Sequence, residues 1–557
     1  MSTFTGLNTM VRGVYINQLA LNTVGHNIVN ADTEGYSRQA VTPVATPPEY
    51  TNGYAVGTGA VAASITRARD VYADIQYRNE NSRQGYYETA ALNYDKLESI
   101  FNDSTDSGIQ NAMEEFYKSW LELSVNASDS SSRISVVQKA KVMTDVLVSA
   151  GDQLRDQISD KYSDIETHVK DINQILEDLS QINRVIVSQE ADKQTMANDL
   201  RDQRDLLVDR LSRYVNVSIH QNDNGSFQVN SNGVALVNGV NRIHLDFSRG
   251  ISGASYGVDY NVVDYVIKVR ETDIVFIPQT GQIKSEMDAI EECKSYYDRL
   301  SDMAAYMLTA LNDQHKQGYD LTGELGRNFY GVTGETYEYN YDAGNNYIYL
   351  RVINDADGEY MTDRDGNVLE LTGIQILRKM KVNEDFDITG GYKYVAAATA
   401  YDDSYEYTSS TDLSEHQIDW GNRTGDGTNA VYISELFNMN YDNIVSAGRC
   451  NAVAITKYAS QQSTLNSLGG VSLNSFYNSA MMKLGVDAKA MDTTIEQQDL
   501  VMEQIQNWRD STAGVDWNEE LSNMIKYQKG FGACSRCLSA MDECLEKLVS
   551  STGVVGR

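Results

Sequence analysis

The side chains that could do chemistry are cysteines, histidines and acidic residues, and their spacing decides whether they form a site. Cys534 and Cys537 stand three residues apart, which is the spacing of half a zinc or redox centre. A zinc centre needs a second pair of ligands, and the neighbouring sequence holds none with that spacing. Both cysteines also fall within a helical pattern of apolar residues. We therefore predict small, buried cysteines that pack between helices.

The histidines are scattered and give no constellation for catalysis. The six are His26, His168, His220, His244, His315 and His416. His168 falls beside a line of regularly spaced apolar residues and is expected to be a packing or surface histidine, not a ligand. His315 falls near a helix end, where a partial positive charge is favourable. Acid–base catalysis needs a titrating group held in a cleft against a partner, and no spacing here predicts one. We therefore expect no catalytic residue, no enzyme activity and no cofactor.

One acidic loop has part of the pattern of a calcium site. The run 363–367 places two aspartates and an asparagine around Gly366. An EF-hand calcium loop needs a further ligand pair before the glycine and a glutamate at its twelfth position, and both are missing. The same residues are typical of a tight turn between strands. We predict a hairpin turn at this position and no metal site.

Length and charge limit the classes of function. A chain of 557 residues, 41% of them hydrophobic, is expected to form more than one domain with real cores. Its net charge of −32 argues against the basic face that nucleic acids and anionic membranes require. No stretch approaches the twenty apolar residues of a membrane span, and we expect no cleavable secretory signal at the start. Neither nucleic acid nor membrane is expected as a partner.

The negative charge is unevenly distributed along the chain. Residues 1–69 hold four basic and three acidic residues, and residues 516–557 hold five basic and six acidic residues. Almost the whole net charge therefore falls on residues 70–515. Near-neutral ends can pack against copies of themselves, whereas an acidic middle suits a solvated outer surface.

Both ends of the chain carry apolar residues at helical spacing. The apolar residues near the start are Leu7, Met10, Val14, Leu21, Val24 and Ile28, and those near the end include Leu521, Met524, Phe531, Leu538, Met541 and Leu545. Steps of three, four and seven give a narrow apolar stripe that needs a partner helix, because such a helix is unstable alone. We predict that the two ends pair into a coiled coil and that these residues form an assembly interface.

The middle of the chain alternates between helical and β patterns. Residues 70–212, 286–325 and 431–515 are predicted to form a helical core domain, and residues 213–285 and 326–430 one or two outer β domains. Ile158, Ile165, Ile172, Leu179 and Ile186 fall seven apart, and Leu200 and Leu207 keep the phase, which predicts one long helix. The predicted fold class is α+β and multidomain, with a terminal-helix coiled coil (1–69 and 516–557), a long-helix bundle core and inserted all-β regions.

Two short segments carry a resemblance to a known family. After the first helix stand Asn27, Asn30, Thr33, Gly35, Tyr36 and Arg38, a run that ends the helix in a turn. This run closely resembles the N-terminal signature of the bacterial flagellar axial proteins, the rod, hook and junction subunits. A second segment, at Asp202, Gln203, Arg204 and Asp205, is similar to a segment of the junction subunits of that family. Further similarities lie near residues 425–430 and 511–542, so the resemblance spans the chain.

The resemblance implies a structural function outside the cell. It implies a subunit of the bacterial flagellum at the junction between hook and filament, exported by the type III route without signal cleavage. The implied partners are the hook protein, a second junction protein, copies of the same chain in a ring, an export chaperone and the type III export apparatus. The alternatives are another axial subunit, of hook or filament, or a secreted binding protein that uses the tyrosine-rich β region.

Overall fold

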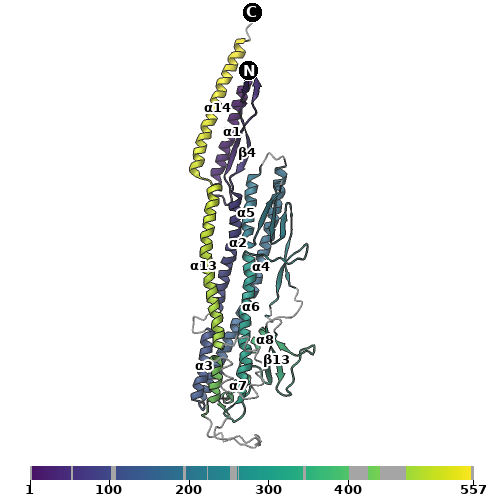
Figure 1. The fold of residues 1–557 in the computed structure, drawn as a ribbon, viewed down its shortest axis with the longest axis vertical. Helices are drawn as coiled ribbons and strands as arrows, with labels where there is room; N and C mark the ends of the chain where they lie inside the picture. The colour runs from purple at the N-terminus through teal and green to yellow at the C-terminus, as the bar shows by residue number, and fades with distance from the viewer. Residues whose placement is uncertain are drawn as a thin grey trace.

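A computed structural model of the chain shows a narrow arm on top of a wider body (Figure 1). The structure describes residues 3–51, 54–101, 108–191, 196–222, 224–250, 260, 262–342, 347–399, 425–438 and 472–552. Both ends of the described chain lie in the arm, and the segments between residues 71 and 513 form the body. The terminal helices are therefore separated from most of the mass of the molecule.

The arm is built on two long antiparallel helices, α1 (Thr3–Val29) and α14 (Trp517–Thr552). Their register follows from close approaches at three glycines. A Cβ added at Gly6 would meet the side chain of Met541, one at Gly13 would meet Cys534, and one at Gly530 would meet Asn17. As the number on one helix rises, the number on the other falls by the same step. The predicted pairing of the terminal helices is confirmed, and it occurs within one chain.

A β ribbon lies along α1. Strand β1 (Gln39–Ala45) pairs antiparallel with β4 (Ala60–Arg67), and the short β2 (Glu49–Thr51) and β3 (Tyr54–Val56) extend the ribbon. The register of β1 and β4 shifts between Thr42 and Pro43. Proline has no backbone N–H to donate to a partner strand, so an irregularity at this point is expected. Arg12 on α1 donates a hydrogen bond from Nη1 to the Thr58 carbonyl (3.1 Å), which ties the ribbon to the helix.

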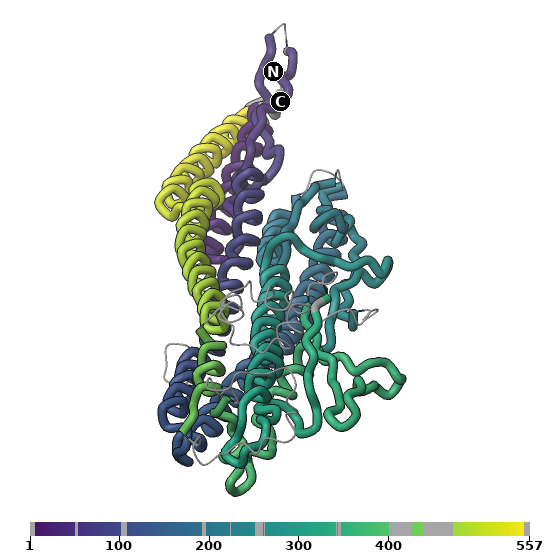
Figure 2. Tube along the Cα trace, turned by 60° about the horizontal axis from the view of Figure 1, so that its bottom comes forward, coloured from purple at the N-terminus to yellow at the C-terminus, as the bar shows by residue number. Residues whose placement is uncertain are grey.

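The body is a bundle of long helices (Figure 2). In chain order they are α2 (Val71–Phe101), α3 (Ile109–Val125), α4 (Ser130–Gln189), α5 (Asn198–Tyr214), α6 (Gln282–Tyr306), a π turn (Met307–Leu311), α7 (Asn312–Gln317), α9 (Thr428–Asn438) and α13 (Leu473–Ala513). Helices α13 and α2 lie side by side below the arm. Within the described residues, none of the helices combines the length and the apolar character needed to cross a membrane.

One helix predicted from the sequence is two helices in the structure. The heptad phase continues from Ile186 to Leu207, but α4 ends at Gln189 and α5 begins at Asn198 and packs against α4. Arg201 of α5 forms an ion pair with Glu190, just after the end of α4 (2.6 Å). Two separate helices that pack on the same core can keep one apolar phase, so the repeat alone does not reveal the break.

Two β regions lie against the helices rather than apart from them. The first is an antiparallel sheet of β5 (Ser218–Gln221), β6 (Phe227–Ser231), β7 (Val234–Asn238) and β8 (Asn241–Arg242), followed by the pair β9 (Leu245–Arg249) and β10 (Tyr265–Val269). Asn183 of α4 is fully buried and binds the sheet backbone. Its Nδ2 donates to the Gly239 carbonyl (2.7 Å), and its Oδ1 accepts from the Phe227 N–H (3.1 Å).

The second β region lies near the other end of the body. It contains β12 (Glu335–Asp342), β13 (Tyr347–Asn354) and β14 (Glu370–Leu371), the small pair β11 (Gly318–Tyr319) and β15 (Ala398–Thr399), helix α8 (Ile374–Lys379) and two 3₁₀ turns (Glu384–Phe386 and Gly391–Tyr394). The Asp363 carboxylate accepts hydrogen bonds from the N–H groups of Asp365 and Asn367 (2.9 Å each). The acidic loop is thus the predicted turn.

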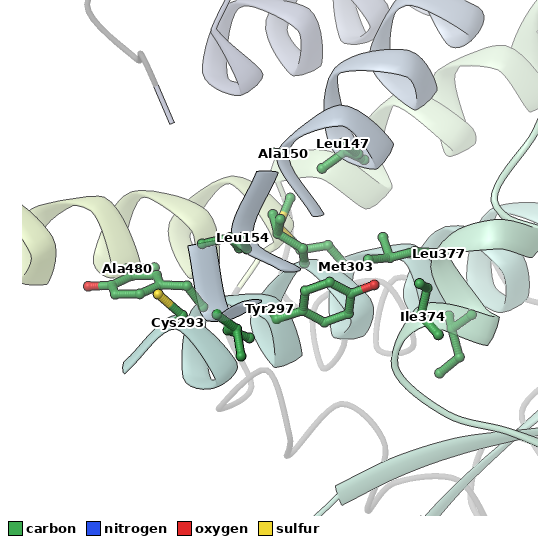
Figure 3. Close-up of a cluster of buried hydrophobic side chains, with 14 of the residues drawn as sticks. Leu147, Ala150, Leu154, Cys293, Tyr297, Met303, Ile374, Leu377 and Ala480 are labelled. Atoms are coloured by element: carbon green, nitrogen blue, oxygen red, sulfur yellow. The ribbon is translucent and has the colours of Figure 1, made fainter. Parts of the chain in front are cut away.

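A single hydrophobic core joins the helices to both β regions. Figure 3 shows one part of it, where Leu154 of α4, Tyr297 of α6 and Leu377 of α8 meet. At Gly151 the elements approach so closely that an added Cβ would stand 2.9 Å from Leu377 Cδ1. Because close packing continues across the regions, the β regions depend on the helical bundle for their cores. The domain boundaries drawn from the sequence remain a prediction.

The prediction of buried, helix-packing cysteines is only partly right. Cys534 is half-buried and faces Gly13 of α1, but Cys537 is exposed, as is Cys544. The reason is the helical period: Leu538 continues the contact line with α1, and Cys537, the residue before it, is rotated about 100° around the helix from Leu538. Cys293 in α6 is fully buried, and burial raises the pKa of its thiol to about 12. Cys450 lies outside the described residues.

His315 lies in the last turn of α7, as expected, but the expected positive charge is wrong. The His315 side chain is buried in the core. Its Nδ1 lies 2.6 Å from the Arg327 carbonyl oxygen, and its Nε2 accepts a hydrogen bond from the Ala396 N–H (2.9 Å). Nδ1 therefore carries the proton and the ring is neutral. Burial lowers the pKa of His315 to about 4. Desolvation of a charged imidazole outweighs the favourable interaction with the helix end.

We predict that His315 stays neutral down to about pH 4. The folded protein holds the neutral ring, so the stability that this residue contributes is complete above pH 6.5, the pKa of an unperturbed histidine, and is lost as the pH falls toward 4. Titration of the histidine ring signals by NMR, with assignment by His315→Gln, should give a midpoint below pH 5. A midpoint near 6.5 would show that the ring is accessible to water.

Candidate assembly site at the arm

The contact line between α1 and α14 uses most of the predicted stripe. On α1, Val24 is buried (4% exposed), and the other predicted residues, Leu7, Met10, Val14, Leu21 and Ile28, are half-buried. On α14 the half-buried residues include Met524, Tyr527, Phe531, Cys534, Leu538, Met541 and Leu545, which follow one another in steps of three and four. This is the a/d spacing of a coiled coil, in which Tyr527 and Cys534 fill positions that the prediction left open. Leu521 was placed in this stripe, but it is 48% exposed and lies on a neighbouring face.

The first family motif folds back on the end of α1. Asn27 is fully buried and acts as a backbone partner for Gln39: its Nδ2 donates to the Gln39 carbonyl (2.9 Å), and its Oδ1 accepts from the Gln39 N–H (3.0 Å). The same Oδ1 accepts from the Tyr36 hydroxyl (2.8 Å). An amide is the side chain that can both donate and accept in this way. Asn27 thereby fixes the direction in which the chain leaves the helix.

The turn between these residues needs its small and polar members. Asn30 donates from Nδ2 to the His26 carbonyl (3.0 Å), and Thr33 donates from Oγ1 to Asn30 Oδ1 (3.3 Å). Gly35 has a φ of +78°, which favours glycine, and an added Cβ would stand 3.1 Å from the Leu206 side chain. The turn is therefore shaped both by its own hydrogen bonds and by contact with α5.

The two family motifs bind each other. Ser37 donates to the Asp202 carboxylate from its N–H (3.0 Å) and from its hydroxyl (2.7 Å). Next to it, Gln39 donates from Nε2 to Asp199 Oδ1 (2.8 Å), and Asn198 donates to the Ile65 carbonyl of β4 (2.9 Å). The sequence identified the segments separately, and the structure shows that α5 is the body's attachment surface for the arm.

Buried ion pairs surround this attachment. We call the group the joint cluster; it consists of Arg67, Arg69, Arg78, Arg509, Asp74, Asp202, Asp205 and Asp209. Arg67 Nη1 lies 2.7 Å from Asp202 and 2.8 Å from Asp205. Arg69 pairs with Asp74 through both oxygens (2.8 and 2.9 Å). The eight side chains come from β4, α2, α5, α13 and the β4–α2 connection, so the cluster joins five parts of the chain.

Asp205 is the centre of the joint cluster. It is 4% exposed and lies within 3.4 Å of guanidinium groups of Arg67, Arg69 and Arg78. Burial alone would raise the pKa of Asp205, but the positive charges of these arginines outweigh it and lower the pKa to about 2. The carboxylate is therefore ionised throughout the physiological range. Its chemistry is that of a fixed counter-charge, because a group that does not titrate near neutral pH is poorly suited to proton transfer.

The start of α14 is held by a second set of ion pairs. Arg38, the last residue of the first motif, pairs with Glu519 (2.6 Å) and with the buried Glu520 (2.7 Å). Its N–H also donates to the carbonyl of Ala513 at the end of α13 (2.9 Å). Arg509 of α13 reaches Asp74 (3.1 Å) and Asp209 (2.7 Å). The elbow between α13 and α14 is thus fixed to the same surface as the first motif.

The other two residues of the second motif, Gln203 and Arg204, lie outside the joint cluster. Gln203 is exposed. Arg204 is fully buried and is directed into the sheet, where it donates to the Gly225 carbonyl (2.6 Å) and lies over the Phe227 ring (3.3 Å to the centroid). Burial lowers the pKa of Arg204 to about 9. Sequence reasoning did not identify Asp209 or Arg509, although the spacing of Asp202, Asp205 and Asp209 on one helix face was a usable signal.

Comparison with known proteins shows what this arrangement resembles. Residues 94–330 match the family model described as the flagellar hook-associated protein FlgK helical domain, and residues 510–551 match the C-terminal model of flagellar basal body rod FlgEFG proteins. Over its whole length the chain is 26% identical to flagellar hook-associated protein 1 of Bacillus subtilis, with all of both chains covered. It is 22% identical to the protein of that name from Salmonella typhimurium, covering 98% of this chain and 99% of the relative.

A solved structure has the same fold. The flagellar hook junction protein FlgK from Burkholderia pseudomallei aligns with a TM-score of 0.54 at 17% identity. The alignment covers 78% of this chain and 100% of that one.

We predict that Asp205→Asn weakens the attachment of the arm to the body. The change leaves several buried arginines without their counter-charge, and breaking a buried ion pair costs about 3–5 kcal/mol. Denaturant unfolding at pH 7 should show this loss, and protease should cut faster near residues 513–516. Gln203→Ala, on the same helix but exposed, is the control and should change stability by less than about 0.5 kcal/mol.

The pH dependence of this difference gives a second check. Asp205 contributes its stability fully above pH 3.8, and the contribution disappears as the pH falls to about 2, where the folded protein also binds the proton. The difference in the free energy of unfolding between wild type and Asp205→Asn should therefore become smaller over this range. A difference that stays constant from pH 7 to 2 would show that it does not come from the charge of the carboxylate.

Proposed function

We propose that the chain is a member of the flagellar hook-associated protein 1 family and forms the structural junction between hook and filament, assembled through its paired terminal helices. Two observations support this function. Relatives of that name align with the chain from end to end, and the match to the helical domain covers residues 94–330 of the body. The match to rod proteins covers the elbow and α14. The arm therefore carries what axial proteins share, and the body carries what is particular to this family.

The observation that carries the proposal is that the joint cluster fixes a near-neutral arm to a strongly acidic body. A near-neutral arm can pack among copies in the flagellar axis, while the acidic body faces outward into water. On this proposal, residues 1–69 and 516–557 form the axial core. Residues 70–212, 286–325 and 431–515 form the helical domain around it, and the β regions at 213–285 and 326–430 are outermost.

The partners follow from this position. We propose contacts with the hook protein on one side, with a second junction protein on the other, and with copies of this chain in a ring. Delivery would use an export chaperone and the type III export apparatus, without cleavage of a signal. The role is structural and not enzymatic, in keeping with polar groups at the joint that are ionised and engaged in ion pairs. A hook or filament subunit and a secreted binding protein are weaker alternatives, because the body matches the hook-associated family.

We predict that cells lacking this chain carry hooks without filaments. The filament could not attach to the hook tip, because the adaptor between hook and filament is absent. Electron microscopy of the deletion strain checks this, and the intact gene should restore filaments. Antibody labelling of isolated flagella should mark one narrow band between hook and filament. Labelling along the whole filament would instead indicate a filament subunit.

We further predict that Val24→Asp abolishes incorporation while the body stays folded. Val24 is buried in the arm, and an unpaired charge there costs several kcal/mol, enough to open the helix pair. The thermal unfolding of the body should not change. Val125→Asp, a substitution of the same type at a site that is 79% exposed in the body, is the control and should incorporate normally. Normal incorporation of the Val24 variant would show that assembly does not require the pairing of α1 with α14.

A further inference from the structure

Pairing of α1 with α14 leaves a groove on the far side of α1. It is lined by Tyr15, Ile16 and Leu19 of α1 and by residues 60–62 of β4, together with Arg12, and its volume is about 330 Å³. Tyr15 is 69% exposed and Val61 is 42% exposed. The lining is mainly apolar, so water in the groove is readily displaced by an apolar side chain. We call this surface the α1 groove.

Helix α14 carries a complementary projection on a face beside its contact line with α1. Trp517, Leu521 and Ile525 stand four residues apart, and their exposed fractions are 48%, 48% and 58%. Residues four apart lie on one side of a helix, so the three form a continuous apolar row. We call this row the α14 ridge. Contiguous apolar surface of this kind on a soluble protein marks an interaction site.

The ridge and the groove cannot meet within one copy. The pairs Gly13–Cys534 and Asn17–Gly530 set the helix register, so the groove residues 12–19 stand opposite positions 528–535 of α14. The ridge, at residues 517–525, lies on average about ten residues farther toward the body. At 1.5 Å per residue this is a separation of about 15 Å along the arm. A ridge that fills a groove must therefore belong to another copy.

We propose that the α14 ridge of one copy docks into the α1 groove of a neighbouring copy with parallel arms. This inference rests on the proposed function for the existence of neighbours and adds which faces they use. Charge supports a second copy as the occupant. The bodies are strongly acidic and repel one another, whereas the arms are near neutral, so like chains approach most easily at the arm.

The contact uses different surfaces on the two copies, so it is heterologous and can be repeated from copy to copy. Its offset of about 15 Å staggers each copy along the axis relative to the neighbour it contacts, so copies joined in this way follow a helical path around the axis.

A photo-crosslink at the groove tests the contact directly. Tyr15 is replaced by the photoreactive amino acid benzoylphenylalanine in the full chain, and isolated flagella are irradiated. We expect a crosslinked dimer in which residue 15 is joined to the tryptic peptide 510–526, which contains the whole ridge. The secreted monomer should give no such dimer. Dimers joined elsewhere, or none from a variant that is incorporated, would overturn the proposal.

A matched pair of substitutions gives an independent test. Ile525→Asp places a charge on the ridge, and Ile388→Asp does the same in the body at a site of almost equal exposure, 56% against 58%. We expect both proteins to be secreted with wild-type melting temperatures. Incorporation at the hook tip should fall at least tenfold for Ile525→Asp only, and adding Tyr15→Lys should restore part of it. Wild-type incorporation of Ile525→Asp would refute the docking, whereas absence of the wild-type chain from the junction would refute the proposed function.

Discussion

The position of the arm depends on three aspartates on one face of α5. Asp202, Asp205 and Asp209 are buried, and each meets a guanidinium from a distant part of the chain. A carboxylate buried without such a partner would be severely destabilising, so β4, α2 and α13 must all arrive before the cluster is satisfied. The ion pairs of the cluster can therefore form only when the arm, the elbow and the body all have their native positions.

The parts of the fold that follow local periodicity were predictable from the sequence. The stripes of α1 and α14, the strands after Tyr214 and the turn at Asp363 all have short-range signals, and the structure contains each of them. The end of α4 at Gln189 was missed because the apolar phase continues into α5. Exposure was also misjudged: Leu521 and Cys537 continue a helical pattern, but among the described residues α14 packs mainly against α1, and this contact line covers only part of its surface.

The candidate site required information that a single sequence does not hold. Both motif segments were identified, yet the bond between Ser37 and Asp202 joins residues 165 positions apart. Local patterns carry no record of such a pairing. His315 shows the same limit for electrostatics, because its neutral state follows from burial in the folded core, which lowers the pKa of the ring. Some of the functional residues, such as Asn27 and Asp205, were identified from the sequence, whereas Asp209, Arg509 and the protonation state of His315 were not.

The arm is connected to the body by two stretches of chain, one at residues 68–70 and one at the elbow of residues 514–516, with the joint cluster between them. A single crossing would let the arm swivel about its long axis. Two crossings that are pinned by buried ion pairs oppose torsion, because a twist would have to separate charges in a poorly solvated interior. A subunit built in this way resists twisting between its arm and its body, so a torque applied to the arm is transmitted to the body.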